Sequence, residues 1–194
     1  MVTIDTQNDF SLPLAVAEVP GTFEVLPRME QLLTVYRAQA MPIIHVVRLY
    51  PEDRSNVDLC RREAIEKGHQ IVAPDTEGAE LVPLIRSHNY NGMDSKRLLN
   101  GEFQLVGDQE WIMYKPRWGA FYNTSLEQFL RERGIDTILF IGCNFPNCPR
   151  TSIYEASERD FRTVMIADAM SQVYEQGMEE MRNIGSMYAV WLMR

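Results

Sequence analysis

The chain has 194 residues, of which 45% are hydrophobic and 24% are charged, a composition typical of a globular protein. Its 19 basic and 27 acidic residues give a formal net charge of −8, which disfavours nucleic acids and anionic membranes as partners. Three cysteines are too few for a disulfide framework, and no apolar run is long enough to span a membrane. We therefore expect a single cytoplasmic domain, residues 1–194, that binds neither nucleic acid nor membrane.

The first half of the chain contains apolar segments of both strand and helix type. Apolar residues at i, i+3, i+4 and i+7 indicate an amphipathic helix, and runs of β-branched residues indicate a buried strand. Signals are mixed across residues 51–110. The expected elements are a short strand over 2–4, a helix over 25–39, a strand over 42–50 and a short helix over 57–67.

The second half alternates strands and helices more clearly. The expected elements are a strand over 111–115, helix 125–133, strand 136–142, helix 148–160, strand 162–168 and an amphipathic helix over 177–192. Thr124 and Glu127 have the spacing of a capping box at the start of helix 125–133, and Gly134 is placed to end that helix.

This alternation is typical of right-handed βαβ units, so we expect an α/β fold with three α-β-α layers and a mainly parallel, Rossmann-like sheet. In such sheets ligands bind beyond the carboxyl ends of the strands. Asp5, Lys115 and the loop 142–148 each follow an expected strand. We therefore expect all three to meet at one edge of the sheet.

Cys148 stands at the expected start of a helix, directly after Asn147, which is a good N-cap residue. A helix N-terminus and a nearby cation such as Lys115 lower the pKa of a thiol and favour the nucleophilic thiolate. Asp5 supplies a carboxylate able to move a proton. Taken singly, Cys148 could be a small buried residue, Lys115 a solvated strand end and Asp5 a turn residue. Together they favour a nucleophilic site.

Three segments carry a more specific pattern: IDTQNDF (4–10), YKPRWGAFYNTSLEQFLRERGIDTILFIG (114–142), and GCNFPNC with the helix that follows it (142–160). In this order they resemble the isochorismatase-like cysteine hydrolase superfamily. The resemblance covers nearly the whole chain except residues 51–110. The superfamily has more residues before its first catalytic aspartate, so we expect the first strand here to have little length for pairing.

The resemblance implies hydrolysis of a C–N bond in a small amide or carbamoyl/ureido compound through a thioester intermediate. It implies that Asp5 is the general acid/base, Lys115 the activating cation and Cys148 the nucleophile. It also implies a non-proline cis peptide bond at Cys143–Asn144. The backbone N–H groups of Asn144 and Cys148 would then form the oxyanion hole.

Nicotinamidases of this superfamily hold a metal with an Asp-x-His pair and a further histidine. Residues 45–60 read HVVRLYPEDRSNVDLC and contain no such pair. We therefore expect no metal and no cofactor, and we interpret His45 as a hydrogen-bonded core residue.

Several residues at strand exits are candidates for substrate contact, since they come where the loops of the site begin. The candidates are Phe10, Arg48, Trp118 and Phe145, with Tyr50 and Arg117 as further cases. Phe145 either walls the pocket or packs on the helix beneath it. Cys60 and Cys143 are interpreted as structural, and Asp168 as a residue that holds a neighbouring loop.

Two alternatives to a C–N hydrolase stay open at this stage. One is an isochorismatase-type hydrolase of a vinyl ether, which needs no cysteine. The other is a binding module that keeps the fold without turnover. The substrate is expected to be a small molecule in each catalytic case. We also expect a homo-oligomer, a dimer or a tetramer, because pocket walls in this fold often come from a neighbouring subunit.

Overall fold

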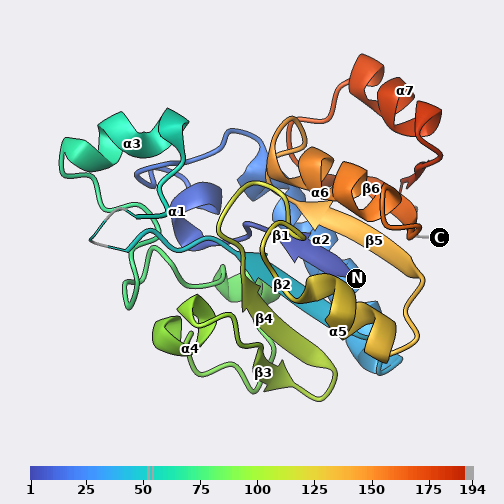
Figure 1. The fold of residues 1–194 in the computed structure, drawn as a ribbon, viewed down its shortest axis with the longest axis horizontal. Helices are drawn as coiled ribbons and strands as arrows, with labels where there is room; N and C mark the ends of the chain where they lie inside the picture. The colour runs from blue at the N-terminus through green and yellow to red at the C-terminus, as the bar shows by residue number, and fades with distance from the viewer. Residues whose placement is uncertain (52, 54, 191–194) are drawn as a thin grey trace.

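A computed structural model describes residues 1–51, 53 and 55–190, and its centre is a sheet in the order β3-β4-β2-β1-β5-β6-β7 (Figure 1). Within these residues every strand pair is parallel except β3 with β4. The strands are β1 (Val2–Ile4), β2 (Ile43–Val47), β3 (Gln104–Gly107), β4 (Glu110–Tyr114), β5 (Thr137–Gly142), β6 (Arg162–Met170) and β7 (Met187–Ala189). The expected mainly parallel α/β sheet is confirmed.

Helices cover both faces of this sheet, which gives the expected three layers (Figure 1). The helices are α1 (Asn8–Ser11), α2 (Thr22–Ala38), α3 (Leu59–Glu66), η1 (Pro83–Ile85), α4 (Ser95–Leu99), α5 (Leu126–Glu132), α6 (Cys148–Ser157) and α7 (Glu175–Asn183). The apolar side chains of α2 share one core with Ile43 and Val47. Those of α5 and α6 share a second core with Ile44 and Val46. Successive residues of β2 thus point to opposite layers, because side chains alternate along a strand.

Strand β1 is short but lies at the centre of the sheet. Val2 is paired with Ile44 of β2 on one side and with Phe140 of β5 on the other. As expected, β1 has little length for pairing, since it contains only three residues. All three are nevertheless buried. At its end β1 approaches Gly142, where an added Cβ would lie 2.3 Å from the carbonyl oxygen of Ile4 and where φ is +126°. A side chain therefore has no room at position 142.

Two of the sequence predictions are wrong in detail. The last helix does not run over 177–192: α7 ends at Asn183, Gly185 has a φ of +80°, and the chain continues into β7. Residues 191 and 192 of that prediction lie outside the described part of the chain. The capping box is also wrong, because the N-cap of α5 is Ser125 and its side chain makes no capping bond. Gly134 follows the C-cap of α5 with a φ of +65°, as expected.

Candidate active site

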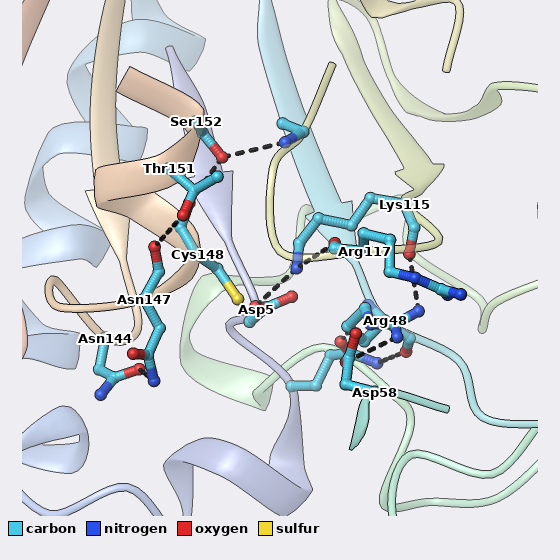
Figure 2. A network of polar contacts seen from close by, with 12 residues as sticks. Asp5, Arg48, Asp58, Lys115, Arg117, Asn144, Asn147, Cys148, Thr151 and Ser152 are labelled. Atoms are coloured by element: carbon cyan, nitrogen blue, oxygen red, sulfur yellow. Dashed lines mark hydrogen bonds and ion pairs between the residues drawn. The ribbon is translucent and has the colours of Figure 1, made fainter. Parts of the chain in front are cut away.

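Three side chains from distant parts of the sequence meet at the carboxyl ends of the central strands (Figure 2). Asp5 follows β1 and its backbone N–H donates to Val46 O at 2.9 Å, whereas Lys115 follows β4 and its N–H donates to Val47 O at 3.0 Å. Cys148 begins α6 after the loop that leaves β5. The sheet therefore brings together the residues that the sequence placed at its edge.

The charged members of this group form a buried ion pair. Lys115 Nζ lies 2.9 Å from Asp5 Oδ2, with Lys115 fully buried and the Asp5 side chain 6% exposed. Burial works against the charge of Lys115, but the negative charge of Asp5 outweighs it and raises the pKa of the ammonium. Asp5 Oδ1 has no hydrogen-bond partner among the described residues. One carboxylate oxygen is thus engaged by Lys115, and the other is free to accept a proton.

The Cys148 sulfur points toward Asp5 and Lys115 (Figure 2). Burial raises the pKa of this thiol, the charge of Asp5 raises it further, and the charge of Lys115 opposes both. The expected lowering of this pKa is therefore wrong. Asp5 is near enough to cancel much of the effect of Lys115, so the resting form is a neutral thiol beside a carboxylate that can act as its base.

This electrostatic balance predicts slow alkylation of Cys148 at neutral pH. Exposed Cys60 should react with iodoacetamide faster than Cys148, because the thiolate is the reactive form. In Asp5→Asn the carboxylate that raises the thiol pKa is gone and Lys115 remains, so labelling of Cys148 should accelerate. Peptide mass spectrometry over a pH series measures both rates. Labelling of Cys148 that is fast in the wild type and slower in Asp5→Asn would contradict this balance.

The loop before Cys148 contains a cis peptide bond at Cys143–Asn144, as expected. Neither the backbone N–H of Asn144 nor that of Cys148 donates to an acceptor within residues 1–51, 53 and 55–190. Asn147 is the N-cap residue of α6, but its side chain makes no capping bond and donates to Asn144 Oδ1 at 3.3 Å instead. Two amides next to the thiol are therefore available to a ligand.

A small cavity of about 40 Å³ opens in front of these groups. Its lining includes Asp5 and Cys148 together with four of the predicted substrate contacts: Phe10, Arg48, Tyr50 and Trp118. The interpretation of Phe145 as a pocket wall is wrong. Its ring is fully buried in the core and packs edge-on against Tyr174 with a centroid distance of 5.5 Å. Phe145 is therefore a packed core residue and not a wall of the cavity.

The cavity also has a wall that the sequence did not reveal, made by Asp58, Cys60 and Arg61 at the start of α3. Arg48 Nη2 donates to Asp58 Oδ2 at 2.8 Å, and Tyr50 Oη donates to the same oxygen at 2.8 Å. Cys60 is exposed, so its interpretation as a structural residue is wrong. Because α3 buries none of its own residues, its sequence lacks the apolar pattern that would have predicted these contacts.

The described residues hold no cluster of three His, Cys, Asp or Glu side chains suited to a metal ion. His45 lies in the core, where its ring nitrogens meet Thr3 Oγ1 at 2.8 Å and Glu110 Oε1 at 2.7 Å. Its two nitrogens are thus occupied far from the thiol, as the sequence predicted. The same part of the chain includes no helix with the length and apolar character that crossing a membrane requires.

Comparison with solved structures shows a close counterpart of this fold. The isochorismatase family protein from Desulfovibrio vulgaris matches with a TM-score of 0.83 and 30% sequence identity, over 97% of this chain and 92% of that chain. N-carbamoylsarcosine amidase from Thermoplasma acidophilum matches with a TM-score of 0.72 and 20% identity, over 97% and 94% of the two chains. The second likeness shows the fold alone.

Curated relatives at the sequence level include named amidohydrolases. The chain is 33% identical over 203 residues to ureidoacrylate amidohydrolase RutB of Methylorubrum extorquens, which is 97% of this chain and 76% of the relative. It is 28% identical over 192 residues to a probable inactive nicotinamidase of Arabidopsis thaliana, or 95% and 88% of the two. The profile of the isochorismatase domain matches residues 1–191. The chain therefore belongs to the isochorismatase family of hydrolases.

Proposed function

We propose that this protein hydrolyses the C–N bond of a small amide or carbamoyl/ureido compound, with Cys148 as nucleophile, Asp5 as proton carrier and Lys115 as the cation that positions Asp5. The observation that carries the proposal is the buried pair of Lys115 and Asp5 beside the thiol, with a separation of 2.9 Å. A buried ion pair is weak evidence for stability, whereas paired titratable groups beside a nucleophile suit catalysis. The likeness to a ureidoacrylate amidohydrolase supports this substrate class.

In the first half of the reaction Asp5 removes the thiol proton of Cys148 as the sulfur attacks the carbonyl carbon. The electron pair of the carbonyl moves to its oxygen, where the N–H groups of Asn144 and Cys148 donate to the negative charge. When the tetrahedral intermediate collapses, the C–N bond breaks and the protonated Asp5 gives its proton to the leaving nitrogen. The products of this half are an amine or ammonia and a thioester on Cys148.

In the second half a water molecule replaces the leaving group. Asp5, again a carboxylate, takes a proton from this water as it attacks the thioester carbon. The intermediate expels the sulfur, which regains its proton from Asp5, and the acid leaves. The free Oδ1 of Asp5 suits both transfers, since Oδ2 is held by Lys115.

Lys115 is held in place by the surrounding backbone as well as by Asp5. Its Nζ also donates to Arg117 O at 3.3 Å, and its carbonyl accepts from Arg48 Nη1 at 3.0 Å. We infer that the ammonium keeps Asp5 charged and correctly turned between transfers, and that it stabilises the thiolate while the S–H bond breaks.

The cavity in front of the thiol is the space that would receive the reacting group of a small substrate. A groove of about 650 Å³ lies beside it and shares Asp58, Cys60 and Trp118 with the cavity wall. The groove would therefore accommodate the part of a substrate that extends beyond the cavity.

The test is ammonia release from a panel of small amides and ureido compounds by the wild type and by Cys148→Ser. We expect release from at least one compound, and a loss of about 10³-fold or more in Cys148→Ser. A far-UV circular dichroism spectrum of Cys148→Ser that matches the wild type ties the loss to the missing thiol rather than to misfolding. A folded wild type that releases no ammonia from the whole panel would overturn the proposal in favour of a binding module. Pyruvate release from isochorismate would support the vinyl ether reaction instead.

A further inference from the structure

We infer that Arg61, together with the free Nε of Arg48, binds a carboxylate on the substrate, so that the compound cleaved is a small amide or ureido acid with a negative charge. The inference rests on the proposed function and narrows its substrate class. It assigns a binding role to a residue of α3, which lies in the segment 51–110 where the sequence analysis found only mixed signals.

Arg61 lies at the cavity rather than on the outer surface of α3. The residue lines the cavity, and its guanidinium carbon is 5.2 Å from the centroid of the Phe10 ring, which lines it too. The guanidinium therefore lies over a ring that forms another part of the cavity wall.

The charge of Arg61 has no counter-ion in the described part of the chain. Two other ionic groups of the cavity are already neutralised: Asp5 is paired with Lys115 at 2.9 Å, and Asp58 with Arg48 at 2.8 Å. Arg61 forms no ion pair with any carboxylate within residues 1–51, 53 and 55–190. With Cys148 neutral, the cavity carries one uncompensated positive charge, which one carboxylate would balance.

Arg48, which also lines the cavity, supplies a second donor. Its side chain is 2% exposed, and its Nη atoms donate to the carbonyl oxygens of Lys115 and Asn56 and to Asp58 Oδ2. Its Nε has no acceptor among the residues that the structure describes. A buried N–H without an acceptor is unfavourable, so an incoming oxygen at this position is favoured. Arg48 would thus add one bond to the carboxylate, whereas the planar guanidinium of Arg61 can donate two in parallel.

The arrangement predicts how a substrate would lie. The carbamoyl or amide carbon faces Cys148 and the two free amides of the preceding loop, and the carboxylate faces Arg61 across the same small space. The small volume of the cavity, about 40 Å³, favours an acid with only a few atoms between the two groups.

Two compounds of similar shape, one with a carboxylate and one neutral, test whether the protein recognises the negative charge of its substrate. The acid 3-ureidopropionate and the neutral compound propylurea share the carbamoyl group and the three-carbon chain, and only the first ends in a carboxylate. We expect the wild type to release ammonia from the acid with a kcat/KM at least ten times that for propylurea. Arg61→Ala should lower kcat/KM for the acid at least tenfold, mainly through a higher KM, with little change in kcat/KM for propylurea. Arg61→Lys should recover part of that loss.

Lys67→Ala is the matched control, because it removes a positive charge from the other end of α3, where the side chain is exposed and lines neither the cavity nor the groove beside it. It should leave the ratio between the two probes as in the wild type. Equal losses for both probes in Arg61→Ala, or a wild type that prefers propylurea, would overturn the inference.

A binding measurement distinguishes failure of the inference from failure of the proposed reaction. Calorimetric titration of Cys148→Ser with each probe needs no turnover. Tighter binding of 3-ureidopropionate that disappears in the Cys148→Ser, Arg61→Ala double variant supports the carboxylate site even if the wild type proves inactive. Equal affinity for the two probes in Cys148→Ser contradicts the site even if ammonia is released.

Discussion

Replacing Asp5 with Asn is expected to slow ammonia release by about 10²–10⁴-fold and to lower the free energy of unfolding by about 3–5 kcal/mol. Asparagine keeps the size of the side chain but accepts no proton from Cys148 or water. The loss should therefore lie in kcat more than in KM. Steady-state kinetics and urea denaturation of the same preparations measure the two effects.

The loss of stability has a different origin from the loss of activity. Lys115 is fully buried, so without Asp5 its ammonium keeps only the carbonyl of Arg117 as a partner, at 3.3 Å. Burial then lowers the pKa of Lys115 without opposition, since the negative charge that raised it has gone. Part of the lost stability should return as the pH is raised and the amine becomes neutral.

The double variant Asp5→Asn, Lys115→Met separates the two origins. It removes both charges and replaces the lysine with an apolar chain of similar length, so most of the stability should return while activity stays low. Recovery of activity in this variant would remove Asp5 from the chemistry. An Asp5→Asn protein with the same free energy of unfolding as the wild type would contradict the expected loss of stability.

The second large effect is expected at Glu110, the first residue of β4, at the opposite end of that strand from Lys115. Its carboxylate accepts from Arg37 Nε at 2.8 Å and Arg37 Nη2 at 2.7 Å, and His45 Nε2 lies 2.7 Å from Oε1. Burial raises the pKa of Glu110, but the hydrogen bonds and charges of Arg37 and His45 outweigh this and lower it to about 2. Glu110→Gln should lower the free energy of unfolding by about 3 kcal/mol, with kcat of the folded protein unchanged.

The pH dependence follows from the direction of that shift. A glutamate ordinarily titrates near 4.5, so the stabilisation is complete above that pH and is lost as the pH falls toward 2. The difference in unfolding free energy between wild type and Glu110→Gln should therefore shrink across this window. Glu102→Gln is the matched control, since Glu102 pairs with Arg97 at the surface at 3.3 Å and should contribute less than about 1 kcal/mol. A constant difference from pH 6 to pH 3 would contradict the assignment.

The sheet and the positions of the three central residues could be predicted from the sequence for a simple reason. Strands β2, β4, β5 and β6 are marked by apolar runs in the sequence. Because ligands bind beyond the carboxyl ends of parallel strands, knowing where each strand ends is enough to identify the residues near the site. Strands β3 and β7 were missed. Both lie at the edges of the sheet, where one side is unpaired and the apolar pattern is weak.

The wall formed by α3 could not be predicted, because its contacts depend on the path of residues 51–67 over the site rather than on local pattern. Arg61 and Arg62 are adjacent arginines in the sequence, and only the helix geometry decides that the first lines the cavity. The pKa of Cys148 was predicted in the wrong direction for a similar reason. The sequence indicated a helix N-terminus and a cation, whereas the degree of burial and the distance to Asp5 exist only in the folded chain.

The central place of β1 has a consequence for how the protein is made. Strand β1 is synthesised before both of its neighbours, and one of them, β5, begins only at Thr137. At 5–20 residues per second, the ribosome needs roughly 7–30 s to add the intervening chain. Throughout that interval an apolar strand edge is unpaired and open to other nascent chains. A chaperone that covers this edge would thus raise the yield of active protein more than one that acts after release.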